Sequence, residues 1–123
     1  MATMYHNVLS RYNGKTQFEV FSEITKNCRN IQVIKADSKK ASIPASKLSF
    51  ALIDGNHDPE YVESDFNLIW NKLPSGGGIA LHDFEGDLPQ TTAKIKELIT
   101  RHNDQISSVL QEKQKWLVYL IKK

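Results

Sequence analysis

A short apolar segment that ends in a carboxylate occurs twice in this chain, and it constrains the fold more than any other feature. The first segment ends in Asp54, with His57 three residues later, and the second ends in His82 and Asp83. Continuous apolar runs of this length are typical of strands buried within a parallel sheet. Ligands of open α/β sheets bind outside the carboxyl ends of such strands. The pattern therefore predicts one site that contains two aspartates and two histidines, one of each from each segment.

Helical periodicity alternates with these strands. Apolar residues recur at helical spacing over residues 16–29, 59–73 and 90–103, and Cys28 is expected on the buried face of the first helix. Thr16 and Asp58 are suitable N-caps. Loops are expected at residues 1–15, 37–47 and 83–88, with a turn at 13–14. These intervals place a helix between the two apolar segments.

Further short strands are predicted at residues 31–36 and, as a C-terminal hairpin, at 106–110 and 116–121. Strands that alternate with helices and then end in a hairpin predict an α/β fold. We expect one domain over residues 1–123, a three-layer sandwich with a mostly parallel sheet and an antiparallel C-terminal pair.

Composition limits the function classes. The 123 residues carry a net charge of +2 with scattered lysines and arginines, so neither nucleic acid nor a membrane is an expected partner. The basic doublet at 122–123 is expected to be solvated. No apolar run approaches the roughly 18 residues that span a bilayer, and the N-terminus lacks a signal-peptide core. A cytoplasmic location is the expectation, and a single cysteine excludes an internal disulfide.

Two motifs at a fixed separation resemble a known family. Residues 53–57 read Ile-Asp-Gly-Asn-His, and residues 77–84 read Gly-Gly-Ile-Ala-Leu-His-Asp-Phe. With Tyr61 and Asp65 between them, they resemble the small-molecule branch of the class I S-adenosylmethionine-dependent methyltransferases. The likeness covers roughly residues 16–121, and it implies a Rossmann-like fold with S-adenosylmethionine as cofactor.

One family motif is absent. Members begin with a strand, a Gly-x-Gly-x-x-Gly turn and a second strand, and this turn lets the backbone approach the cofactor. No such turn occurs here, so the chain resembles the second half of the domain, without the first two strands. The family sheet order is 3-2-1-4-5-7-6. We expect the strand at 31–36 to close directly against 49–54, giving the order 3-4-5-7-6 with weak self-association.

The resemblance assigns roles to the carboxylates. It implies that Asp54 and Asp83 bind a divalent metal such as magnesium, which takes oxygen ligands, and that Asp54 also contributes to cofactor binding. Asp54 could instead cap the turn that follows it. Asp37 and Ser38 lie where the third strand of the family ends, and a side chain there can bind the adenine. The alternative is a simple Asp-Ser turn.

His57 and His82 are candidate general bases, because imidazole titrates near neutral pH and could accept a proton from a hydroxyl. The alternatives are a solvent-facing loop histidine for His57 and a buried ring bonded to backbone for His82. The implied function is methyl transfer to a hydroxyl of a small molecule or sugar. Two other interpretations stay open: a non-catalytic remnant or binding module, and a half-enzyme completed by a partner chain or a second copy.

Overall fold

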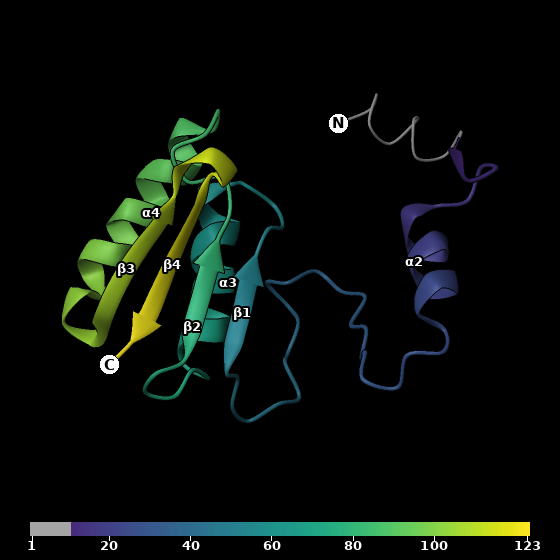
Figure 1. The fold of residues 1–123 in the computed structure, drawn as a ribbon, viewed down its shortest axis with the longest axis horizontal. Coiled ribbons are helices and arrows are strands. Elements are labelled where there is room, and N and C mark those ends of the chain that lie inside the picture. Colours follow the sequence, from purple (N-terminus) through teal and green to yellow (C-terminus); the bar gives the residue numbers. More distant parts are fainter. Residues whose placement is uncertain (1–10) are drawn as a thin grey trace. The chain divides into compact units, whose positions relative to one another are not determined.

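The computed structural model describes residues 11–123, which fall into two compact units that divide after Lys35. The elements along the chain are α2 (Gln17–Thr25), β1 (Phe50–Ile53), α3 (Pro59–Trp70), β2 (Gly78–Leu81), α4 (Pro89–Arg101), β3 (Ile106–Glu112) and β4 (Leu117–Lys122), with single 3-10 turns at Asn103–Gln105 and Lys113–Lys115 (Figure 1). No helix in this part of the chain has the length and apolar character needed to cross a membrane.

The first unit contains α2, whose start is set by a capping box. The Thr16 hydroxyl accepts a hydrogen bond from the Glu19 N–H, and the Glu19 carboxylate accepts one from the Thr16 N–H. Two helix-terminal donors are thereby satisfied. The predicted helix and its cap are confirmed, although the helix ends earlier, at Thr25. The predicted burial of its apolar face is wrong, because α2 has no buried residue and Cys28 is exposed.

The prediction of a strand at residues 31–36 is also wrong. The segment has no regular structure, and Ile31, Val33 and Ile34 are all more than 40% exposed. A short extended segment becomes a strand only when another strand bonds to its backbone and packs against its side chains. No described strand pairs with this segment, so its β-branched residues are not sufficient to form one.

The second unit contains a four-stranded sheet of order β1-β2-β4-β3. The β1–β2 pairing is parallel, and β4 is antiparallel to both β2 and β3. The predicted mixed α/β class and the C-terminal hairpin are confirmed. The predicted order 3-4-5-7-6 is wrong by one strand, because β1 is an edge of the sheet instead of pairing with residues 31–36.

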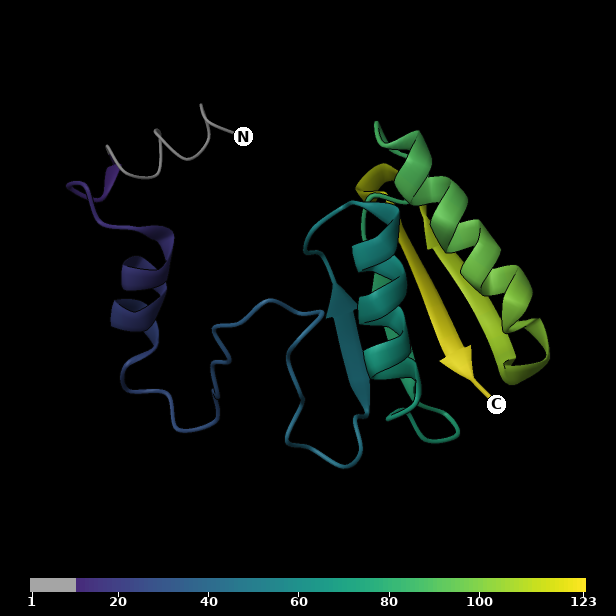
Figure 2. The same cartoon turned by 180° about the vertical axis from the view of Figure 1, so that it is seen from behind.

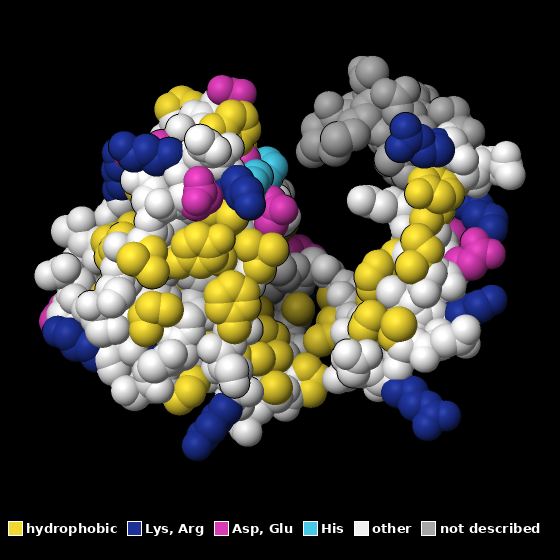
Figure 3. All heavy atoms as spheres, in the orientation of Figure 1, with side chains coloured by type: hydrophobic (Ala, Val, Ile, Leu, Met, Phe, Trp, Pro, Cys, Tyr) yellow, Lys and Arg dark blue, Asp and Glu magenta, His cyan; other side chains and the backbone are white. Residues whose placement is uncertain are grey.

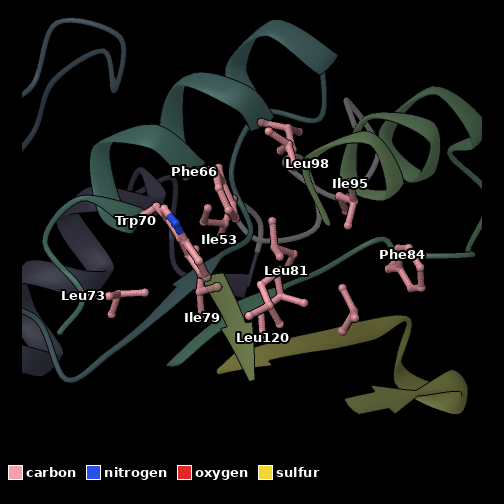
Figure 4. Packing of buried hydrophobic residues seen from close by; sticks show 13 residues of the cluster. Ile53, Phe66, Trp70, Leu73, Ile79, Leu81, Phe84, Ile95, Leu98 and Leu120 are labelled. Atoms are coloured by element: carbon pink, nitrogen blue, oxygen red, sulfur yellow. The ribbon is translucent and has the colours of Figure 1, made fainter. Parts of the chain in front are cut away.

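Helices α3 and α4 cover one face of this sheet, as the two opposite views show (Figures 1 and 2). Within residues 36–123 the fold therefore has two layers of the expected sandwich. The core lies between the helices and the sheet (Figure 4). Its members are Ile53, Val62, Phe66, Trp70, Leu73, Ile79, Leu81, Phe84, Ile95, Leu98, Ile106, Val118 and Leu120.

Hydrophobic side chains also gather on the sheet face that these helices leave uncovered (Figure 3). Phe50, Leu52 and Leu110 are each more than half exposed. Because side chains alternate along a strand, Phe50 and Leu52 point away from the core that Ile53 joins. The edge strand β1 thus presents apolar side chains as well as unpaired backbone groups.

Candidate functional site

The carboxyl ends of β1 and β2 meet at one edge of the sheet. The two strands are parallel, with Ile53 opposite Leu81, and the His82 N–H donates a hydrogen bond to the Ile53 carbonyl at 3.0 Å. Asp54 directly follows β1, and His82 and Asp83 directly follow β2. The structure thus places at one edge the side chains that the strand-end argument predicts to lie together.

These side chains form a continuous chain of contacts centred on Asp83. Oδ2 of Asp83 lies 2.9 Å from Nδ1 of His57 and 3.2 Å from Nδ1 of His82. The same His82 nitrogen lies 3.2 Å from Oδ1 of Asp54. Asp83 is buried, with 8% of the residue exposed, whereas Asp54 and the two histidines remain accessible. A fixed carboxylate therefore faces two imidazole rings that solvent or a ligand can reach.

Nδ1 of His82 is buried and has no hydrogen-bond partner of acceptable geometry, although two carboxylates lie close to it. A buried polar atom without a partner is unusual and needs an explanation. Asp54, His82 and Asp83 each offer one ligand atom, and these atoms lie within 4.8 Å of one another. The three atoms therefore lie close together, and the His82 nitrogen among them has no hydrogen-bond partner.

The spacing of these atoms fits a divalent cation. Ligand atoms held about 2.1 Å from a metal lie about 3.0–3.4 Å apart at octahedral or tetrahedral angles. The two His82 separations of 3.2 Å fall in that interval. Carboxylate oxygens suit Mg²⁺ and Mn²⁺, and an imidazole nitrogen also suits the later transition metals. The residues present thus fit a bound divalent metal.

The backbone around Asp83 is held in an uncommon conformation. Asp83 has a φ of 60° and Glu85 a φ of 56°, in the left-handed region that residues other than glycine rarely adopt. The Glu85 N–H donates to the Thr92 hydroxyl at 2.9 Å. A hydrogen bond from Gln111 and a smaller contribution from Lys96 lower the pKa of the Glu85 carboxyl. Contacts with α4 and with the hairpin therefore fix the loop after β2.

His57 lies in the loop between β1 and α3, and neighbouring residues hold this loop. The carbonyl of His57 accepts a hydrogen bond from the buried Thr91 hydroxyl at 2.8 Å. The Asn56 side chain accepts one from the Asp58 N–H. Asp58 occupies the predicted N-cap position, but its side chain makes no capping hydrogen bond. The loop thus fixes the backbone of His57 and leaves its ring at the surface.

Two hollows adjoin the cluster. A pocket of about 390 Å³ lies beside Asp54 and is lined by Ser38, Leu52, Ile53, Asp54, Gly55, Asp65, Leu68 and Ile69. A second pocket of about 290 Å³ lies beside His57 and is lined by His57, Asp58, Leu88, Pro89, Gln90 and Thr91. Each pocket is therefore lined by one member of the contact chain, Asp54 in the first and His57 in the second.

Asp37 and Ser38 have different surroundings in the structure. The Asp37 carboxylate accepts a hydrogen bond from the Lys39 N–H at 3.0 Å, as in the simple turn that was the alternative for this pair. Ser38 lines the pocket beside Asp54. Asp65 also lines this pocket, and its Oδ1 is buried without a partner. Asp65 was visible in the sequence as part of the family pattern, but no strand-end argument predicts it as a site residue.

Comparisons with known proteins identify the family and the fold of this chain. A family model described as a methyltransferase domain matches residues 5–84. Among solved structures, that of the O-methyltransferase NovP is similar to this chain, with a TM-score of 0.66 and 18% identity. The match covers 94% of this chain and 49% of that one, so the chain spans about half the length of this relative. No curated protein sequence matches. On the family match over most of its length, this chain belongs to the methyltransferase domain family.

Proposed function

We propose that this chain supplies the strand-end half of the active site of an S-adenosylmethionine-dependent O-methyltransferase that acts on a small molecule or sugar. One observation carries the proposal. The ligand atoms of Asp54, His82 and Asp83 converge at the sheet edge where α/β folds bind ligands, and one of them has no partner of its own. Membership of the methyltransferase domain family supports methyl transfer as the chemistry.

Asp54, His82 and Asp83 would hold a divalent metal at this edge. Such an ion lowers the pKa of a bound hydroxyl and so makes it a better nucleophile. We assign His82 to this ligand set, and not to proton transfer, because its Nδ1 lies between two carboxylates. A metal-binding imidazole and its carboxylate neighbours are usually oriented by further hydrogen bonds. The His57 contact to Asp83 would supply that orientation.

His57 is the proposed general base. Its Nδ1 lies against Asp83, which leaves Nε2 free to accept the proton of an acceptor hydroxyl. The ring is 40% exposed and lines the pocket of about 290 Å³, which is where the acceptor would bind. A carboxylate that orients one ring nitrogen makes the opposite nitrogen the acceptor of the proton.

The pocket beside Asp54 is the proposed position of the nucleoside part of the cofactor. Ser38, Asp54 and Asp65 provide oxygen atoms along an otherwise apolar wall. The glycine-rich turn for the remaining part is not among the 123 residues. We propose that a partner chain supplies it beside the exposed edge of β1, because an unpaired strand edge accepts further strands.

Calorimetric titration with Mn²⁺ tests the metal site. We expect saturable binding by the unaltered protein, and loss of at least tenfold in affinity in Asp54→Asn and in Asp83→Asn. Asp104→Asn is the matched control, because Asp104 is exposed at the opposite end of α4. Equal affinity in all four proteins would contradict the metal assignment.

A second titration tests the cofactor. S-adenosylmethionine is titrated into the protein with saturating Mn²⁺ and into the Asp65→Asn variant. Binding that this substitution weakens would support the cofactor pocket. No binding in either protein, with the metal bound, would favour the binding-module interpretation or the need for a partner chain. Methyl transfer restored by a co-expressed polypeptide that carries the glycine-rich turn would then decide between these two.

A further inference from the structure

We propose that Trp116, at the tip of the β3–β4 hairpin, is a positioning residue that holds Asp83 in place for metal binding. The inference rests on the proposed function, since it concerns the same site. Trp116 lies more than thirty residues from Asp83 in the sequence and outside the buried core. Its contacts nevertheless converge on the loop that carries Asp83.

The loop needs such a restraint. Asp83 and Glu85 both have positive φ angles, of 60° and 56°. The left-handed conformation is unfavourable for a residue with a Cβ atom. Two such residues within three positions are stable only where neighbouring structure enforces them. Residues 84–85 form a turn, and the short loop belongs to no helix or strand.

The hairpin tip provides two restraints. The Phe84 N–H, in the residue directly after Asp83, donates to the Trp116 carbonyl at 2.9 Å. The indole ring lies against the backbone of Gly86 so closely that a Cβ atom added there would be 2.7 Å from the ring. Carbon atoms do not approach so closely, and only glycine allows this contact. The backbone and the ring of Trp116 therefore hold the loop at two points, one on each side of Glu85.

The placement of the ring indicates a role other than core packing. Trp116 is 38% exposed, and it also has a positive φ of 51° at the end of the hairpin. Large aromatic residues that stabilise a fold usually do so by burial. Here the aromatic surface covers a glycine in the loop next to the metal ligands. The consequence is a link from the C-terminal hairpin to the position of the Asp83 carboxylate.

The test compares three variants by calorimetric Mn²⁺ titration of the whole chain. We expect Trp116→Ala to weaken binding by about tenfold or more, as removal of a positioning group around a metal does. Trp116→Phe keeps a flat ring over Gly86, and its affinity should stay near that of the unaltered protein. Leu110→Ala removes an exposed apolar side chain from the same hairpin and is the control, with no expected change. If Trp116→Ala binds Mn²⁺ as tightly as Leu110→Ala, the inference is overturned.

Amide hydrogen exchange separates this inference from the proposed function. Without metal, the Phe84 N–H should exchange faster in Trp116→Ala and in Gly86→Ala than in the unaltered protein, because both changes remove the ring from Gly86. Gly86→Ala also serves if Trp116→Ala does not fold. If the unaltered protein fails to bind Mn²⁺ while these exchange rates rise, the proposed metal site is wrong and the restraint on the loop stands. Unchanged exchange rates in both variants overturn the restraint itself.

Discussion

The ammonium group of Lys122 donates a hydrogen bond to the carbonyl of Trp70 at 2.9 Å and so joins the end of β4 to the end of α3. The same group donates to the Leu73 carbonyl at 3.0 Å and lies 5.3 Å from the centre of the Trp70 ring. The sequence predicts Lys122 and Lys123 as an equivalent solvated pair. The structure shows instead that Lys122 is partly buried and donates to carbonyls at and just beyond the C-terminal end of α3.

Lys122→Met should therefore destabilise the fold. The substitution keeps a long side chain but removes the charge that binds the two carbonyls. Hydrogen bonds that involve a charged group contribute about 1.5–3 kcal/mol, so we expect a loss of this order in the free energy of unfolding. Urea denaturation measures it. Lys123→Met, at the exposed neighbouring position, is the control and should unfold like the unaltered protein.

A surface ion network between α3 and α4 predicts a dependence of stability on pH. A hydrogen bond from Arg101 and a smaller contribution from Lys94 lower the pKa of Glu63 from 4.5 to about 2. Because the pKa is lowered in the folded state, the stabilisation is complete above pH 4.5 and is lost as the pH falls toward 2. The unaltered protein should lose more stability between pH 5 and about pH 3 than Glu63→Gln does.

Denaturation curves at several pH values check this expectation. Glu112→Gln is the control, because no ion pair involves Glu112 in the described part of the chain. The difference in acid-induced loss of stability between the unaltered protein and Glu63→Gln should shrink at high salt, which screens exposed charges. The same loss with pH in Glu63→Gln and in the unaltered protein would mean that other groups govern the acid sensitivity.

The positive φ of Asp83 predicts the relative stability of two variants that both lack the carboxylate. Asp83→Gly relieves the left-handed backbone, whereas Asp83→Ala does not. We expect the glycine variant to be more stable than the alanine variant by about 1 kcal/mol. Thermal unfolding compares them in the absence of metal. A more stable alanine variant would show that the loop does not keep this conformation in solution.

The distribution of buried residues predicts that residues 36–123 fold without the first unit. Every member of the core cluster lies between Ile53 and Leu120, and α2 has no buried residue. A chain shortened to residues 36–123 should retain a single cooperative transition in urea, with a midpoint close to that of the whole chain. Loss of cooperativity on shortening would show that the first unit contributes to the core.

Local patterns in the sequence were sufficient to predict much of the fold. The turn signals and periodic apolar residues predict α3, α4 and the hairpin, because each pattern is set by a face buried against the same core. The strand at 31–36 could not be predicted correctly from its β-branched residues, since a strand depends on a neighbour that the sequence of the segment does not encode. The buried face assigned to α2 is wrong for the same reason.

The candidate site, too, could be predicted only in part from the sequence. The proximity of Asp54, His82 and Asp83 is predictable, because parallel strands place their ends at one edge. Their roles as ligands remain a prediction. The contact of Trp116 with Gly86 joins two distant parts of the chain. The indole ring occupies the space that a side chain at position 86 would need. No periodicity or spacing in the sequence indicates such a contact.

The two tryptophans of the chain lie in opposite environments, which makes each an optical reporter of a different region. Trp70 is 2% exposed within the core, and Trp116 is 38% exposed beside the loop that carries Asp83. Emission from Trp116 should be red-shifted and open to dissolved quenchers, whereas emission from Trp70 should be blue-shifted and protected until the core unfolds. The Trp116→Phe protein thus isolates a fluorescence signal from the core alone, and the difference spectrum reports the state of the loop.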